Sequence, residues 1–176
     1  MLNVLGSLAP LPAADHPGLL AEPVAKAIAG LSGVLVAEID PELADTAAFC
    51  EAYGSPMEFS ANCVVVSGKR SGEVRFAACL VLATTRADVN GVVKRRLDVR
   101  KASFAPMDQA VELTGMEYGG ITPLGLPADW PLLIAPEVAA AEAVVVGSGI
   151  RGSKLAVPGA VLAALPNAEV VAGLAS

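Results

Sequence analysis

The chain has 176 residues, of which 54% are apolar and only 4% aromatic, and its formal net charge at pH 7 is −6. This length suits one domain with a substantial core, which must be built largely from Ala, Val and Leu. Asp, Glu, Pro or Gly interrupts each apolar stretch before the roughly 18–20 residues that a membrane-spanning helix needs, so we expect no association with a membrane.

The N-terminal segment, residues 1–12, contains two prolines and lacks the Lys or Arg of a secretory signal. We therefore interpret residues 1–15 as a loosely held tail, or as a strap lying on a single domain that spans residues 16–176. The only histidine, His16, lies beside a proline at this boundary. One histidine cannot form a metal cluster, and we interpret it as a surface residue ahead of a helix, with a catalytic role as the lesser alternative.

The three cysteines, Cys50, Cys63 and Cys79, are odd in number and widely spaced, with no CxxC pair. This usage favours buried, reduced thiols over a disulfide framework or a zinc site. We therefore expect a cytoplasmic protein without a metal ion.

Apolar spacing and turn signals predict short helices alternating with strands in the first half of the chain, and hairpins in the second. Asp40 followed by Pro41 is typical of a helix start, and Gly54 of a helix end. Together these elements favour an α+β fold with a mixed, largely antiparallel sheet. The predicted helices are 20–30, 40–53, 88–97, 107–113, 136–140 and 158–165. The predicted strands are 34–39, 62–67, 73–83, 102–105, 132–135, 143–146, 154–157 and 168–171, with an exposed turn at 68–72.

Charge is distributed unevenly along the chain. Residues 1–60 hold eight acids and one base, whereas residues 69–101 hold nine bases against three acids. A basic patch on an acidic protein is typical of a surface that binds nucleic acid phosphates. The alternative is a set of solvated hairpin and helix faces. Under the first interpretation, the candidate phosphate-binding residues are Lys69, Arg70, Lys94, Arg95 and Arg96.

Residues 114–125 are the most constrained stretch, with four glycines and one proline among twelve residues. The adjacent Gly119 and Gly120 allow unusual backbone angles and close approach, and Pro123 limits the loop's freedom. A rigid loop of this kind exposes backbone amides that can hold a carbonyl oxygen or an oxyanion. A tight turn between packed elements is the structural alternative. A second glycine-rich turn is expected at residues 147–152.

Three blocks in this order resemble the YbaK/EbsC family of aminoacyl-tRNA editing domains, which also occur as an insertion in bacterial prolyl-tRNA synthetase. The first block is residues 84–90, with the sequence TTRADVN. The second is the stretch from Thr114 to Gly125, in which Gly119 and Pro123 match the family's GxxxP loop. The third is residues 149–152, which look like the family's G-x-R-G turn. The resemblance covers roughly residues 20–172.

The resemblance implies a compact domain around a curved mixed sheet, and hydrolysis of the ester that links a mischarged amino acid to tRNA. No cofactor is implied, because an aminoacyl ester is already activated. The implied partner is the aminoacylated 3′ end of tRNA, with an aminoacyl-tRNA synthetase as a further partner and no role for DNA. The implied catalytic residues are Asn62, Gly119 and Gly120. The implied substrate-binding residues are Thr114, Ile121, Thr122, Pro123, Gly147, Ser148, Gly149 and Arg151.

One position departs from the family pattern. The family usually carries a lysine at the start of the first hairpin strand, where this chain has Asn62. Asparagine can donate and accept hydrogen bonds but cannot supply a positive charge. Lys154, just after the G-x-R-G turn, either replaces the missing cation in part or is an exposed strand lysine.

Three functions therefore stay open at the level of the sequence. The first, and favoured, is a free-standing aminoacyl-tRNA deacylase. The second is a module that binds tRNA or an aminoacyl-nucleotide with little or no catalysis. The third is a small-molecule or protein-interaction domain that shares only the fold, since similarity of fold alone does not determine function.

Overall fold

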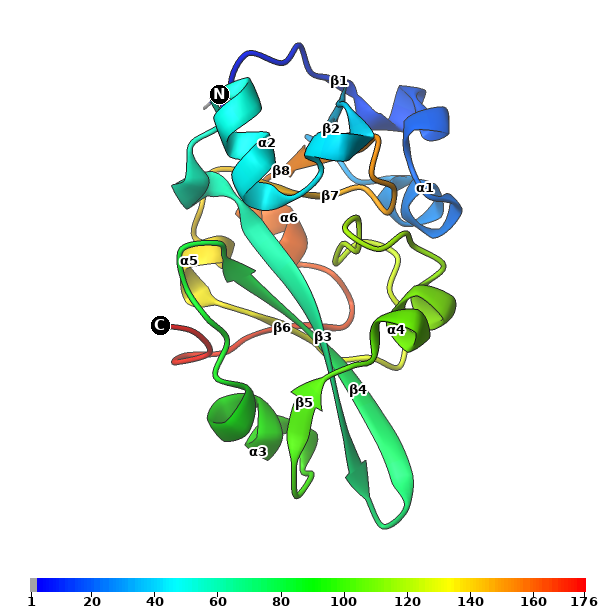
Figure 1. Ribbon diagram of the computed structural model, residues 1–176, viewed down its shortest axis with the longest axis vertical. Coiled ribbons are helices and arrows are strands. Elements are labelled where there is room, and N and C mark those ends of the chain that lie inside the picture. The colour runs from blue at the N-terminus through cyan, green and yellow to red at the C-terminus, as the bar shows by residue number, and fades with distance from the viewer. Residues whose placement is uncertain (1–2) are drawn as a thin grey trace.

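Two β-sheets meet along one seam and organise the fold (Figure 1). The first, with strand order β1-β2-β8-β7, is antiparallel; the second, β5-β3-β4-β6-β9, is mixed, because β6 runs parallel to β4 and β9. A parallel bridge between Ser60 and Val145 joins the sheets where β3 begins beside β7. The computed structural model describes residues 3–176. Its strands are β1 (Leu11–Pro12), β2 (Leu35–Glu38), β3 (Ala61–Arg70), β4 (Glu73–Leu82), β5 (Ala102–Phe104), β6 (Leu132–Ile134), β7 (Val144–Gly147), β8 (Ser153–Val157) and β9 (Ala168–Val170).

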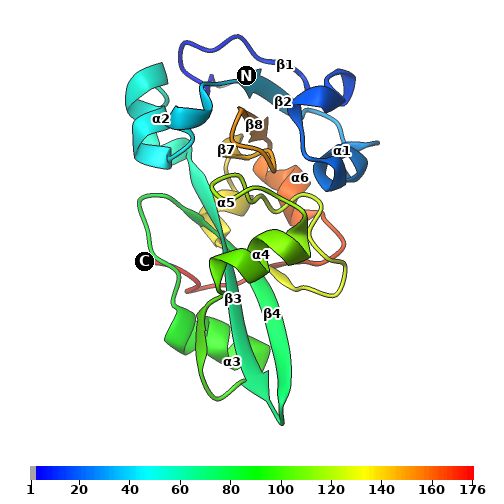
Figure 2. The ribbon, with the colours of Figure 1, turned by 45° about the vertical axis from the view of Figure 1, so that its right-hand side comes forward.

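The helices are short and lie around the sheets (Figure 2). The second helix, α2 (Thr46–Tyr53), ends at Gly54 as predicted, and Gly54 has a left-handed φ of 67°. The prediction that it begins at Asp40 is wrong, because the Asp40 carboxylate accepts a hydrogen bond from the Glu42 amide and starts a separate 3₁₀ turn. The α-helices are α1 (Glu22–Ile28), α2 (Thr46–Tyr53), α3 (Lys94–Leu97), α4 (Met107–Thr114), α5 (Pro136–Ala139) and α6 (Gly159–Ala163), and a π-helical turn (Val89–Val93) leads into α3.

The β3–β4 hairpin extends away from the rest of the molecule (Figures 1 and 2). The predicted turn at 68–72 is too long, since the strands continue to Arg70 and from Glu73. The reason is a third strand, because Gly68 pairs with Ala102 of β5. A Cβ at Gly68 would lie 2.6 Å from the carbonyl oxygen of Lys101. This glycine therefore allows close approach of two strands and does not form a turn.

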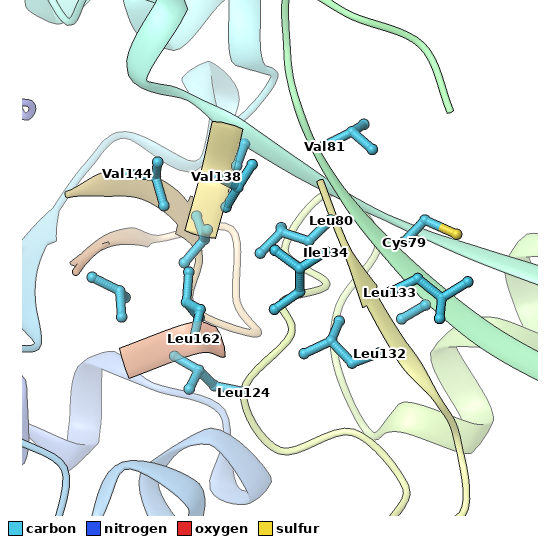
Figure 3. Close-up of a cluster of buried hydrophobic side chains, with 14 of the residues drawn as sticks. Cys79, Leu80, Val81, Leu124, Leu132, Leu133, Ile134, Val138, Val144 and Leu162 are labelled. Atoms are coloured by element: carbon cyan, nitrogen blue, oxygen red, sulfur yellow. The ribbon is translucent and has the colours of Figure 1, made fainter. Parts of the chain in front are cut away.

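The main hydrophobic core lies where β4 and β6 pack against α5 and α6 (Figure 3). Its side chains are almost entirely aliphatic, as the composition predicts. Leu80, Leu132, Ile134 and Leu162 are each fully buried. Burial of one such side chain contributes roughly 1.5–3 kcal/mol, so this cluster stabilises the packing of the parallel β4–β6 pair. No helix in the described part of the chain combines the length and apolar character needed to cross a bilayer.

The N-terminal segment packs against the first sheet. Val4 and Leu5 are buried beside Phe49 of α2. The Ser55 hydroxyl donates to the Val4 carbonyl at 2.7 Å, and the Ser7 amide donates to the Tyr53 carbonyl. From residue 3 onward this packing is that of a strap lying on the domain. The first two residues of the predicted tail lie outside the described residues.

Candidate functional site

A cavity of about 460 Å³ opens at the seam between the two sheets. Its apolar side includes Val65, Ala110 and Ile121, which pack around the buried Trp130. Its polar side comes from the start of α2, the start of β3 and the β7–β8 hairpin. A volume of this size is typical of a small-molecule site. The polar and flanking residues that line it are Asp45, Thr46, Ser60, Asn62, Cys63, Phe104, Met107, Tyr118, Gly119, Gly147 and Lys154.

Lys154 is the buried cation of this cavity. The residue is only 7% exposed, so the alternative of an exposed strand lysine is wrong. The ammonium Nζ donates to the Ala44 carbonyl at 2.8 Å and lies 5.5 Å from the centroid of the Phe49 ring. Burial lowers the pKa of Lys154, and the neighbouring Cys50 and Asp45 partly oppose that shift. The tertiary structure thus places one positive charge in the cavity that Asn62 also lines.

Asn62 is held by α2. Its Oδ1 accepts a hydrogen bond of 3.0 Å from the Thr46 hydroxyl. Because the oxygen is engaged in this way, the amide Nδ2 is left to donate toward the cavity that both residues line. The position where the family pattern has a cation therefore carries an oriented neutral donor.

The Thr46–Asn62 pair can be tested by a double-mutant cycle on whatever activity the cavity supports. We expect Thr46→Val and Asn62→Ala each to lower kcat/KM by about 3- to 10-fold, the size of one hydrogen bond. The double variant should be little worse than Asn62→Ala, because Thr46 acts through Asn62. Losses that multiply would contradict this coupling.

The two glycine-rich turns pack directly against each other. The Gly149 amide donates to the Gly120 carbonyl at 2.7 Å, and the Glu117 amide donates to the Gly149 carbonyl at 2.8 Å. A Cβ at Gly147 would lie 2.5 Å from the Gly120 oxygen, so no larger residue fits there without movement. The two turns therefore form one rigid wall of the cavity.

Backbone amides in this wall differ in their availability. The Gly120 amide is engaged, because it donates to the Glu117 carbonyl at 2.9 Å. Within residues 3–176, the amides of Gly119 and Ile121 have no hydrogen-bond acceptor, and both residues line the cavity. Gly119 has a φ of 82°, which only glycine adopts readily. Two amides of the loop, on either side of Gly120, thus offer free donors of the kind that bind a carbonyl oxygen or an oxyanion.

Four of the eleven candidate catalytic and substrate-binding residues line the cavity, namely Asn62, Gly119, Ile121 and Gly147. The others support the wall from behind. The Thr114 hydroxyl donates to the Ala110 carbonyl in the last turn of α4, and the Ser148 hydroxyl donates within its own turn. Arg151 donates through Nη1 to the Tyr118 carbonyl at 3.3 Å. The remaining four pack within the loops, with no lining role: Gly120, Thr122, Pro123 and Gly149.

The five candidate phosphate-binding residues divide between the hairpin tip and α3. Arg70 forms an ion pair with Asp98 at 3.1 Å, and Arg96 forms one with Glu169. Lys69 and Arg95 are exposed, and Lys94 is half-buried. Among the described residues, Lys69, Lys94 and Arg95 make no ion pair.

Several cavity residues escape detection from the sequence. Asp45 and Thr46 sit inside a segment predicted to be continuous helix, so their place at a helix start is hidden. Phe104 and Met107 flank a short strand with no motif of its own. Tyr118 does have a signal, because it precedes Gly119 in the predicted loop. His16 lies outside the cavity lining and contacts the Pro12 carbonyl through Nδ1.

Residues 40–165 match the profile of the family described as "Aminoacyl-tRNA editing domain". This match spans both glycine turns and all of the polar side of the cavity. The chain belongs to this family. The resemblance inferred from the three sequence blocks is confirmed, and the membership connects this editing domain with aminoacyl-tRNA as its class of substrate. No curated protein matches the sequence significantly.

Solved structures support the fold of the editing domain. One, described as "a putative trans-editing enzyme for prolyl tRNA synthetase", superposes with a TM-score of 0.73 and 21% identity, covering 86% of this chain and 94% of that one. Another, described as "hypothetical protein APE2540", superposes with a TM-score of 0.74 and 22% identity, covering 88% of this chain and 100% of that one. The predicted α+β fold is therefore confirmed, and at this identity the likeness concerns the fold alone.

Proposed function

We propose that this editing domain is a free-standing aminoacyl-tRNA deacylase that hydrolyses the ester of mischarged tRNA. The observation that carries the proposal is the pairing, in one cavity, of a buried lysine with free backbone amides. Lys154 supplies the charge, while Gly119 and Ile121 supply the neutral donors. The volume of about 460 Å³ suits an aminoacyl group with part of the terminal ribose.

In the proposed reaction, a water oxygen attacks the ester carbonyl carbon. Negative charge develops on the carbonyl oxygen, where the Gly119 amide and the Lys154 ammonium stabilise it. The bond from the carbonyl carbon to the ribose oxygen then breaks, and that oxygen takes up a proton, which releases the amino acid and tRNA. Asn62, oriented by Thr46, donates a hydrogen bond to the substrate. The ribose hydroxyl next to the ester orients the water.

A second candidate function is a module that binds tRNA or an aminoacyl-nucleotide with weak or no catalysis. The observation that favours it is Asn62 at the position where the family pattern has a lysine. Under this alternative, Lys154 neutralises a bound phosphate or carboxylate and does not stabilise a transition state.

A deacylation panel tests the proposal against the alternative. Purified protein is incubated with tRNAs charged with different amino acids, and the remaining ester is followed over time. We expect multiple turnovers on at least one mischarged tRNA. A domain that binds the panel with steep salt dependence yet leaves every ester intact would instead support the binding module.

An Asn62→Lys variant sharpens this comparison. If Lys154 already supplies the cavity charge, a second lysine should repel it, and activity should fall or stay unchanged. A variant that becomes active when the natural chain is inert would contradict the assignment of the charge to Lys154.

A further inference from the structure

Two aromatic side chains lie exposed at the rim of the cavity. Phe104, at the end of β5, is 65% exposed, and Tyr118, in the first glycine turn, is 59% exposed. They are the most exposed of the large hydrophobic side chains in the described residues, and both line the cavity. Only 4% of the residues are aromatic, so two exposed aromatic side chains beside one cavity indicate a ligand with an apolar face.

The strand pairing gives this rim a direction. β3 begins in the cavity near Asn62 and runs to the hairpin tip, while β5 runs beside it in the opposite sense. Phe104 pairs with Val66, and Ala102 pairs with Gly68. Moving outward from Phe104, β5 passes through Ala102. The basic residues at the outer ends of β3 and β5 then follow, roughly 10 Å from Phe104 at 3.4 Å per residue. β5 is the edge strand of its sheet, so no further strand pairs with its outer side.

The outer end of this path is positively charged. Lys69, Arg100 and Lys101 are exposed, and among residues 3–176 none of them forms an ion pair. The chain as a whole carries a net charge of −6, which disfavours a polyanion elsewhere on its surface. An aromatic rim that continues into a basic edge fits single-stranded nucleic acid better than a second protein, because stacking and phosphate neutralisation occur together.

We propose that Phe104 and Tyr118 form a stacking site for the base of the terminal nucleotide of tRNA, and that the preceding phosphates follow the β5 edge toward Lys101 and Lys69. The inference rests on the proposed function, and it adds a site for the nucleotide beside the site for the ester. Base stacking on an aromatic ring tolerates any base, so the site reads the single-stranded 3′ end and no particular tRNA.

The test measures binding of an uncharged RNA minihelix that ends in single-stranded CCA, compared with a blunt minihelix of the same stem. We expect the single-stranded end to strengthen binding, and Phe104→Ala to weaken it by about tenfold. Phe104→Trp should preserve affinity, and its fluorescence should be quenched when CCA binds. Val170→Ala is the matched control, because Val170 is 46% exposed on β9 at the opposite edge of the same sheet.

The outcomes separate this site from the proposed function. Equal binding of both minihelices, or equal binding by Phe104→Ala and the natural chain, would overturn the stacking site even if deacylation is observed. Loss of affinity in Phe104→Ala without any deacylation by the natural chain would contradict the proposed function and support the site. If light scattering shows that Phe104→Ala turns a dimer into a monomer with unchanged RNA affinity, the rim is a protein interface and the inference is wrong.

Discussion

Replacing Lys154 with Met is expected to lower kcat/KM for deacylation by about 10²–10³-fold while leaving the fold intact, because it removes one charge that stabilises an oxyanion. Methionine occupies a similar volume among Ala44, Phe49 and the cavity wall. The Ala44 carbonyl loses the hydrogen bond from Nζ, which destabilises the fold by roughly 1–3 kcal/mol, and relief of the buried charge offsets this loss. Circular dichroism and thermal unfolding check the fold.

Lys26→Met is the matched control for Lys154→Met. Lys26 is an exposed lysine that pairs with Glu22 within α1, so its loss should change both activity and stability little. Equal activity of Lys154→Met and the natural chain would remove Lys154 from the proposed mechanism. A comparable loss in Lys26→Met would mean that activity follows net charge and not the cavity.

The pH dependence of stability supplies an independent check on Lys154. Its pKa is lowered in the folded chain by burial, whereas the unfolded chain keeps the ordinary lysine value of about 10.4. Between those two pKa values the unfolded state binds more protons, so the free energy of unfolding rises with pH, by up to about 1.4 kcal/mol per pH unit. We expect this rise in the natural chain relative to Lys154→Met. If the free energy of unfolding changed with pH in the same way in both proteins, folding would not lower the pKa of Lys154.

Gly147→Ala is expected to damage stability and activity together. A Cβ at this position would lie 2.5 Å from the Gly120 oxygen and 3.0 Å from the Ile121 oxygen, and both are backbone atoms. Overpacking of this kind destabilises by about 1–3 kcal/mol, a fall in Tm of roughly 3–10 °C for a domain of this size. The displaced loop carries the Gly119 and Ile121 amides, and a shift near 1 Å lowers kcat/KM by about 10²-fold. Scanning calorimetry and the deacylation assay measure the two effects.

Gly18→Ala is the control for that substitution. Nothing lies within 4 Å of the Cβ that it would add, and Gly18 does not have a positive φ. The free energy of unfolding should change by less than about 0.5 kcal/mol, and activity should not change. A Gly147→Ala variant as stable and as active as Gly18→Ala would show that the two turns separate easily, contrary to a rigid wall.

Local signals in the sequence carry much of the fold. Hydrophobic periodicity and turn residues locate nearly every element, and Gly54 ends its helix as expected because a left-handed cap needs glycine. The errors arise where a residue has a second structural use. The sequence predicts Gly68 to be a turn residue, but in the structure it allows a neighbouring strand to approach closely. The sequence predicts Asp40 to cap a long helix, but in the structure it caps a 3₁₀ turn. Both depend on contacts that local periodicity does not encode.

The features of the candidate site also divide into those that local sequence signals predict and those that depend on the tertiary structure. The sequence by itself determined the two glycine turns, the family to which the chain belongs and the change from lysine to Asn62. Only the tertiary structure decided that Lys154 is buried beside the cavity, that Thr46 orients Asn62 and that Phe104 lies at the rim. The physical reason is that these side chains come together at the seam between the two sheets. The position of that seam depends on strand register and packing between distant segments, which neighbouring residues along the chain do not determine.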